Sequence, residues 1–159
     1  MNCNISYCEV DANISHQRDA LNLFSSIVQS YFKDKSYGTD VYTISIGIIM
    51  VRMEPGYEAW YKPRKPRYIK YKEIIPRNEW SNIREKIIIE KELYLETRLS
   101  NDVYDQLCNA SEEDSWRIFA NELLKALRLL DELPKIIKDF NKEQFKDDAK
   151  RFLVDNNLL

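Results

Sequence analysis

Residues 86–99, KIIIEKELYLETRL, carry the clearest strand pattern in the chain. Apolar and polar side chains alternate there with a period of two, which is typical of a strand with one buried and one solvent-facing side. A helix over residues 79–92 is the alternative, and the period of two persists too long to favour it. The side chains expected on the buried face are Ile87, Ile89, Leu93, Leu95 and Leu99. Those expected on the solvent-facing side are Glu90, Glu92, Tyr94, Glu96 and Arg98. This strand therefore requires a sheet that is covered on one face.

Three further strands are predicted. The stretch VYTISIGIIMVRM, residues 41–53, is apolar at nearly every position, which predicts a central strand with a neighbour on each side. Residues 3–10 favour a short first strand, and residues 67–75 alternate more weakly. Glu54, Pro55 and Gly56 predict the turn that follows the central strand.

Helices fill the rest of the chain. Apolar residues at steps of three and four predict an amphipathic helix over residues 16–33, capped by Ser15. Later helices are expected to begin after Ser100, Ser111 and Asn141, the last in a capping box with Gln144.

The order strand, helix, three strands, helices predicts a single α+β domain over residues 1–159. We expect an antiparallel sheet of about four strands with the helices packed on one face. The lack of a repeated βα alternation argues against a doubly wound nucleotide-binding sheet.

The composition is that of a soluble protein, with 44% hydrophobic and 31% charged residues. No apolar run approaches the roughly 20 residues that cross a bilayer, and the N-terminus does not resemble a secretory signal. A cytoplasmic location and no membrane contact are therefore expected. Cys3, Cys8 and Cys108 lack CxxC spacing, so we expect packed or idle thiols and neither a disulfide framework nor a zinc site.

No catalytic motif is present: GxGxxG, P-loop and GxSxG patterns do not occur. His16 is the only histidine and is expected beside a helix start on the surface. The sequence thus predicts no enzyme, no catalytic residues, no metal and no cofactor.

Residues 60–72, WYKPRKPRYIKYK, combine six basic residues with four aromatics and no acid. The basic middle of the chain, residues 61–98, has eleven basic and six acidic residues, for a net charge of +5. Its flanks are acidic, at −3 for residues 1–60 and −4 for residues 99–159. The stretch is consistent with a proline-guarded sheet edge, a protein-docking surface or a nucleic-acid contact, and the acidic flanks weaken the last.

Two groups of carboxylates are further candidates. Glu90, Glu92 and Glu96 share the polar side of one strand, which is typical of a solvated face but would also suit a basic partner. Glu112, Glu113 and Asp114 lie in a predicted first helical turn, where the helix dipole favours acids.

The chain contains, in order, an SYCE-type first strand (residues 6–9), an amphipathic helix, an SYG turn (36–38), an isoleucine-rich strand, a strand ending in LETRLS (95–100) and the tail LLKALRLLDELPKIIKDFNKEQF (123–145). In this order, these segments resemble a family of predicted bacterial immunity proteins. These small α+β proteins are encoded beside polymorphic or contact-dependent toxins and carry no catalytic residues.

The resemblance implies an immunity protein that binds and neutralises a cognate toxin domain, with nucleases among the candidate toxins. A nucleic-acid-contacting accessory protein using residues 60–72 is the alternative. The candidate partner-binding residues are Glu90, Glu92, Glu96, Glu112, Glu113, Asp114, Trp60, Tyr61 and Tyr68.

Overall fold

The computed structural model describes residues 1–38, 41–57, 62–75, 86–133, 137 and 139–159, without the side chains of residues 41, 70–75 and 86–90. Its strands are β1 (Asn2–Val10), β2 (Val41–Met50), β3 (Arg67–Ile75) and β4 (Lys86–Arg98). Its helices are α1 (Gln17–Phe32), α2 (Asn101–Cys108), α3 (Glu112–Leu129) and α4 (Lys142–Asp155). Short 3₁₀ turns, η1 (Ala12–Ile14) and η2 (Leu130–Glu132), precede α1 and follow α3.

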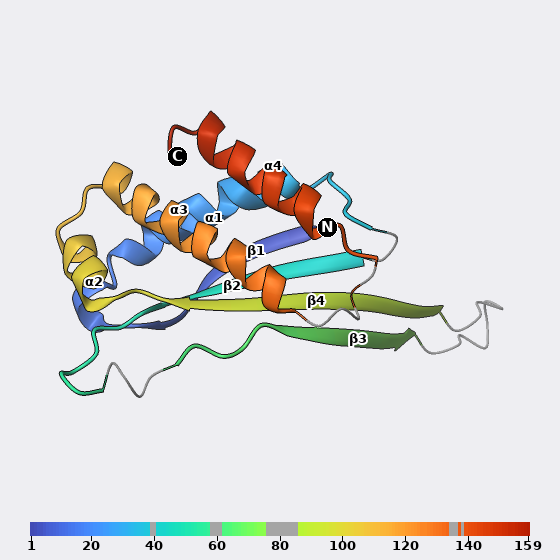
Figure 1. Cartoon of the computed structure of the whole chain (residues 1–159), viewed down its shortest axis with the longest axis horizontal. Coiled ribbons are helices and arrows are strands. Elements are labelled where there is room, and N and C mark those ends of the chain that lie inside the picture. Colours follow the sequence, from blue (N-terminus) through green and yellow to red (C-terminus); the bar gives the residue numbers. More distant parts are fainter. Residues whose placement is uncertain (39–40, 58–61, 76–85, 134–136, 138) are drawn as a thin grey trace.

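The four strands form one sheet in the order β1-β2-β4-β3 (Figure 1). The predicted α+β class is confirmed, and β2 is central as expected. The expectation of an antiparallel sheet is wrong, because β2 runs parallel to both β1 and β4 and only β3 pairs antiparallel with β4. A single strand–helix–strand unit explains the first parallel pair, since α1 carries the chain back to the end where β1 began.

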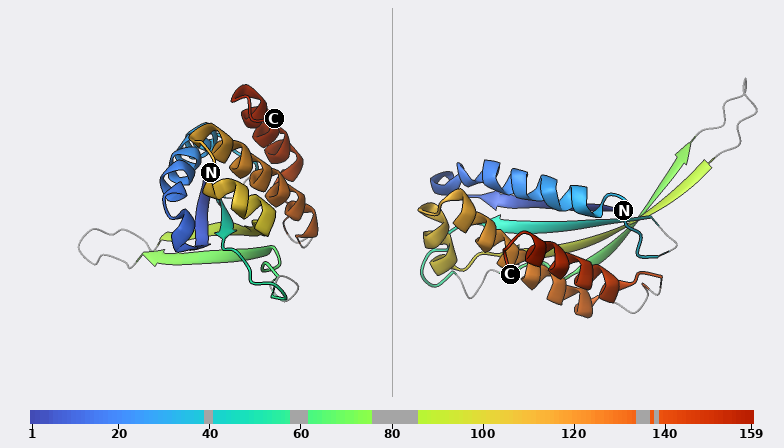
Figure 2. Two further views of the ribbon diagram at one scale, coloured as in Figure 1. Left: turned by 90° about the vertical axis from the view of Figure 1, so that its left-hand side faces the viewer. Right: turned by 90° about the horizontal axis from the view of Figure 1, so that it is seen from above.

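All four helices lie on one side of the sheet (Figure 2). The β2 side chains that face the helices are buried along the whole strand. Helix α1 packs on β1, whereas α3 packs on β2 and β4. Phe24 of α1 joins the helices to one another, with ring centroids 5.7 Å from Trp116 and 6.0 Å from Phe119 of α3 and 6.2 Å from Phe152 of α4. The core thus occupies the space between the sheet and the helices.

Three of the predicted helix caps are confirmed. The side chains of Ser100, Ser111 and Asn141 accept hydrogen bonds from backbone N–H groups at the start of α2, α3 and α4. The predicted Ser15 cap is wrong: His16 is the N-cap of α1 and makes no side-chain capping bond. Ser15 itself is helical because it closes the preceding turn, where its N–H donates to the Ala12 carbonyl.

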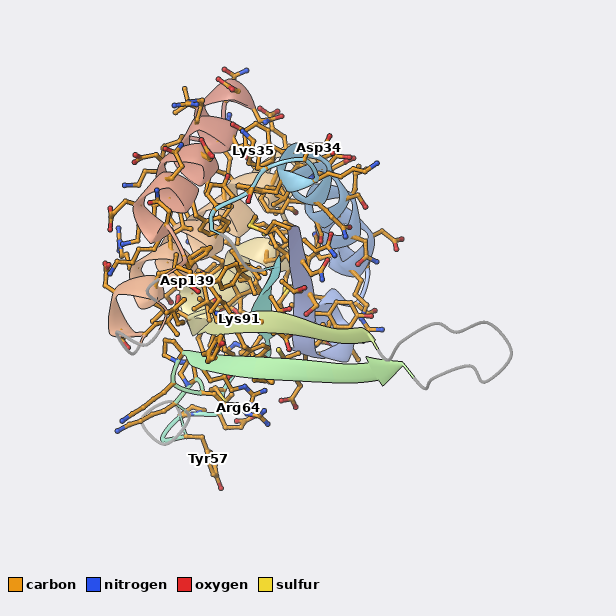
Figure 3. The ribbon with its side chains drawn as sticks, turned by 90° about the vertical axis from the view of Figure 1, so that its right-hand side faces the viewer. Asp34, Lys35, Tyr57, Arg64, Lys91 and Asp139 are labelled. Carbon is orange, nitrogen blue, oxygen red and sulfur yellow. The ribbon has the colours of Figure 1, made fainter. Side chains whose placement is uncertain are left out.

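The turn after β2 is also confirmed. The N–H of Tyr57 donates to the carbonyl of Glu54 at 3.0 Å, and Gly56 has the positive φ of 91° that favours glycine. Beyond this turn, residues 62–66 pass beside β4 on the way to β3. Figure 3 shows Arg64 and Tyr57 on the side of the sheet away from the helices, whereas Lys91 and Asp139 lie on the helix side.

Candidate partner-binding surfaces

The first turn of α3 displays three carboxylates. Glu112, Glu113 and Asp114 are all exposed, and the Ser111 hydroxyl accepts a hydrogen bond from the Asp114 N–H at 3.2 Å. Arg117 lies 3.1 Å from Glu113 and 3.8 Å from Asp114, so it neutralises part of their charge. Within the described part of the chain, Glu112 makes no ion pair, and its charge faces solvent.

A hollow of about 430 Å³ lies between the start of α1 and the connection that leads into α3. Asp19 and Glu112 line it together with Leu23, a large apolar side chain that is 47% exposed. We call Asp19, Leu23, Glu112, Glu113 and Asp114 the acidic surface. It combines concentrated negative charge with an exposed apolar anchor, which are features that protein interfaces use.

A buried hydrogen-bond network holds the acidic surface together. Gln17 of α1 donates to the carbonyl of Leu107 at 3.0 Å and accepts from the Ser115 hydroxyl at 2.9 Å. These bonds tie the start of α1 to both α2 and α3. The carboxylates of the two helices are therefore presented from one fixed framework.

The carboxylates of β4 have different surroundings. Glu96 is only 6% exposed, and its oxygens accept from the Arg64 N–H at 2.7 Å and from the Tyr94 hydroxyl at 3.1 Å. Glu92 is half-buried and accepts from the Ser45 hydroxyl at 2.9 Å. The side chain of Glu90 lies outside the described residues. The face of β4 that carries the polar side chains is therefore less exposed to solvent than expected, because residues 62–66 cover it at Glu96.

Cys8 of β1 contacts Tyr94, the β4 residue whose hydroxyl donates to Glu96. Its Sγ lies 3.0 Å from the Tyr94 hydroxyl, and Gly47 leaves room for the contact because a Cβ there would overlap both groups. Burial, and then the contact with Cys8, raise the pKa of the Tyr94 hydroxyl. Burial also raises the pKa of the Cys8 thiol. A raised pKa keeps the thiol protonated near neutral pH, where a thiol is a poorer nucleophile than a thiolate.

The other two cysteines are free thiols as well. Burial raises the pKa of Cys3 to about 12 and also raises that of Cys108. The interpretation of all three as packed or idle thiols agrees with these environments. Across the described residues, no three side chains of the metal-binding types gather at one point.

A family model with the description Immunity protein 44 matches residues 1–155. The chain belongs to this immunity protein family. The predicted resemblance is thereby confirmed over nearly the whole length of the chain. No curated protein and no solved structure matches the chain significantly. Among the described helices, none combines the length and apolar character needed to cross a membrane.

In this immunity protein the basic stretch divides between two sides of the sheet. Arg67 places its guanidinium 4.7 Å from the centre of the Tyr94 ring, on the face away from the helices. Tyr68 points to the helix side, where it is half-buried against the core. Trp60 and Tyr61 lie outside the described residues. Because β3 is an edge strand, the edge interpretation of the stretch agrees with the topology.

His16 sits at the surface beside the acidic surface, as expected for a residue at a helix start. Its ring Nε2 is 3.2 Å from the Gln17 side-chain nitrogen, and it lines the same hollow as Asp19. The sequence reasoning did not connect α1 with the carboxylates of α3, because Asp19 and Glu112 are 93 positions apart. Only the packing of α1 against α3 brings them together.

The sequence reasoning also missed two buried acids. Glu122 of α3 is 1% exposed, and Asp148 of α4 accepts hydrogen bonds from the Tyr37 hydroxyl at 2.5 Å and from Gln144 at 3.1 Å. A signal for Glu122 existed, since Ser115, Phe119, Glu122 and Ala126 follow helical spacing and are all buried. Only the apolar positions of this helix were used to predict its buried face, so Ser115 and Glu122 were left out.

Proposed function

We propose that this immunity protein neutralises a cognate toxin domain by forming a stoichiometric complex with it. Membership of the family supports the proposal, because an immunity protein implies a toxin partner. Inhibition by occupation of the toxin's surface needs no catalytic step and no cofactor. The encounter would take place in the cytoplasm of the cell that makes the protein.

The acidic surface is the proposed docking region. The observation that carries this choice is the convergence of Asp19 and Glu112 on one hollow beside the exposed Leu23. A toxin that acts on nucleic acid needs a positively charged cleft, and such a cleft would be attracted to these carboxylates over a Debye length of about 8–10 Å. Leu23 would then serve as the desolvated anchor.

The other predicted contact residues take a smaller part in this proposal. Glu92 and Glu96 already accept hydrogen bonds inside the protein, and Tyr68 packs against the core. We therefore assign Glu96 to holding residues 62–66 in place. Glu90, Trp60 and Tyr61 stay candidate contacts from the sequence, and their side chains lie outside the described part of the structure.

Charge reversal tests the proposal. We expect Asp19→Lys combined with Glu112→Lys to weaken binding of the neighbouring toxin gene's product at least about tenfold and to flatten its salt dependence. Calorimetry at two salt concentrations and rescue of growth in toxin-expressing cells would measure this. Asp102→Lys combined with Glu143→Lys is the matched control, since both are exposed acids in the first turns of α2 and α4 and their reversal changes the net charge and the helix-dipole interactions equally.

Two outcomes would count against different parts of the proposal. If the double variant bound with unchanged affinity and salt dependence, the acidic surface would not be the docking region. If the wild-type protein neither bound the toxin nor rescued growth, neutralisation by complex formation would itself be wrong.

A further inference from the structure

A run of exposed cations lies on the helix-free face of the sheet. Residues 62–67 have the sequence KPRKPR, and we call them the basic segment. Its four cations are exposed, and within the described part of the chain none of them forms an ion pair with a carboxylate: Lys62, Arg64, Lys65 and Arg67. Figure 3 shows Arg64 on the side of the sheet opposite to the helices. Four positive charges in six residues therefore face solvent together.

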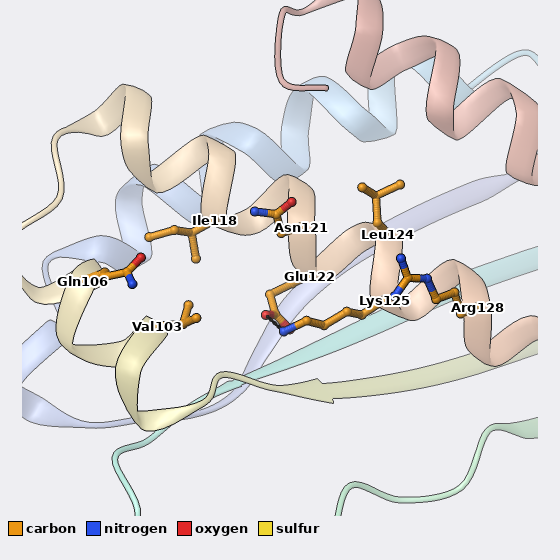
Figure 4. Close-up of a pocket in the computed structure, with 8 residues that line it drawn as sticks. All are labelled: Val103, Gln106, Ile118, Asn121, Glu122, Leu124, Lys125 and Arg128. Atoms are coloured by element: carbon orange, nitrogen blue, oxygen red, sulfur yellow. Dashed lines mark hydrogen bonds and ion pairs between the residues drawn. The ribbon is translucent and has the colours of Figure 1, made fainter.

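Most of the other cations whose side chains the structure describes have a carboxylate partner. Lys125 of α3 is an example, because its ammonium lies 2.8 Å from Glu122 and Figure 4 shows the two side chains directed at each other. Arg52 likewise lies 3.0 Å from Asp105 of α2. These pairs offset charge within the protein, whereas the charge of the basic segment is left for a partner.

The basic segment is held in one conformation before any partner binds. The rings of Pro63 and Pro66 fix two of its φ angles. The Arg64 N–H donates to Glu96 at 2.7 Å, and the Arg67 guanidinium lies 4.7 Å from the centre of an aromatic ring of β4. Because the backbone is already ordered, binding through this segment loses little conformational entropy.

The basic segment lies near the carboxyl ends of the three parallel strands. Beside it is a hollow of about 330 Å³, which Lys62 and Arg64 line together with Cys8 of β1, Ile49 of β2 and Glu96 of β4. Each of these strand residues is within two positions of the end of its strand. In sheets with parallel strands, this edge is where ligands commonly bind.

Two exposed acids border the hollows beside the basic segment. Glu9 lines the hollow at the strand ends, and Glu132 lines another of about 340 Å³ next to residues 63–66. Neither acid forms an ion pair with the four cations among the described residues. Positive charge therefore predominates on this side of the sheet.

The acidic surface belongs to the same end of the molecule. Helix α1 begins shortly after β1 ends, and α2 and α3 follow the end of β4. Figure 1 shows the starts of α1 and α3 at the same end as the turn that follows β2. This end of the sheet is thus negative on the helix side and positive on the other side. One partner that approaches it can contact both charged surfaces.

We propose that the basic segment binds an acidic region of the toxin and thereby fixes the orientation in which the toxin docks. This inference rests on the proposed function and adds a second contact region to it. Charge complementarity selects an anionic partner, and the family selects a protein, because an immunity protein implies a toxin partner. Carboxylates of the toxin would pair with Lys62 and Lys65. A toxin docked in the reverse orientation would meet like charges at both surfaces, which disfavours it.

Reversal of two charges in the basic segment tests the inference. We expect Lys62→Glu combined with Lys65→Glu to weaken binding of the neighbouring toxin gene's product at least about tenfold at low salt and less than about threefold at high salt, since salt screens exposed charge. Calorimetry at two salt concentrations measures both values. Lys33→Glu combined with Lys150→Glu is the matched control, because both lysines are exposed, form no ion pair with a described carboxylate and change the net charge equally. The control should bind within about twofold of the wild type.

A second variant separates charge from folding. Lys62→Ala combined with Lys65→Ala removes the two charges without adding acids, and we expect it to weaken binding about threefold or more at low salt. Because the side chains are exposed, its melting temperature should equal that of the wild type. Unchanged affinity in this folded variant would contradict the inference.

The remaining outcomes also decide. Equal weakening in the Lys62→Glu, Lys65→Glu variant and in its control would show attraction by overall charge and would overturn the inference. If the variant kept its affinity for the toxin but lost a fluorescein-labelled single-stranded RNA that the wild type binds, the basic segment would be a nucleic-acid contact, which would equally overturn it. Loss of affinity confined to Asp19→Lys with Glu112→Lys would leave the proposed function standing without this second contact.

Discussion

The acidic surface and the carboxylates of β4 contain the same residue types in different environments. Glu112 and its neighbours are exposed at a helix start, where the dipole stabilises them without desolvation. Glu96 is buried under residues 62–66 and uses its oxygens within the fold. Carboxylates that were equal candidates in the sequence therefore divide into one group available to a partner and one group that stabilises the protein.

The difference follows from the backbone around each group. At the start of α3 the Ser111 side chain accepts from the Asp114 N–H, which leaves the acidic side chains in water. A strand face can be covered by another segment of the chain, here the earlier residues 62–66, in which Pro63 and Pro66 lack an N–H group. Among the N–H groups that remain there, that of Arg64 donates to Glu96. Covering the sheet thus converts a surface acid into an internal acceptor.

Among these acids, we expect the largest loss of stability for Glu96→Ala. The change leaves the Arg64 N–H without its acceptor and removes one partner of the Tyr94 hydroxyl. We expect the free energy of unfolding to fall by about 3 kcal/mol, measured by urea denaturation. Glu112→Ala is the control and should change it by less than about 0.5 kcal/mol. An equal loss of stability in Glu96→Ala and Glu112→Ala would contradict the division of these acids into a stabilising group and an exposed group.

Tyr94 provides a second measure of the covered face through its pH dependence. Burial and the contacts with Cys8 and Glu96 raise the pKa of its hydroxyl above the ordinary value. The unfolded chain therefore loses this proton first, so the associated stability is present below about pH 10 and is lost as pH rises above it. Urea denaturation at pH 9 and pH 11 should show a smaller loss in Tyr94→Phe than in the wild type. If Tyr94→Phe and the wild type lost the same stability between pH 9 and pH 11, groups other than Tyr94 would cause the loss.

Patterns within a single element made much of the fold predictable. Alternation located the bounds of β3 and β4, and side-chain capping located the starts of α2, α3 and α4. The antiparallel expectation failed because local patterns contain no information about which strand lies beside which. The crossover through α1 and the outer position of β3 are decided by packing of the whole chain.

The candidate surfaces were predictable to a smaller degree. The exposure of Glu112, Glu113 and Asp114 follows from their place in a helical turn, and this part of the sequence reasoning agrees with the structure. The burial of Glu96 depends on a contact with Arg64, 32 positions earlier. The role of Asp19 depends on how α1 packs against α3. Such tertiary contacts leave no periodic trace in the sequence.

The smallest expected effect concerns Arg117, the cation within the acidic surface. Arg117→Ala removes the positive charge beside Glu113 and Asp114, which makes this surface more negative. We expect the association rate with a basic toxin to rise about twofold at low salt and to return to the wild-type value at high salt. The free energy of unfolding should change by less than about 0.5 kcal/mol, because exposed pairs at these helical spacings contribute little.

Stopped-flow association at two salt concentrations measures this effect, and Arg151→Ala is the matched control. Arg151 is also exposed and pairs within its own helix, with Asp148 of α4. Removal of either arginine changes the net charge of the protein equally. A faster association in both variants would therefore indicate attraction by overall charge, whereas a change confined to Arg117→Ala would locate the attraction at the acidic surface.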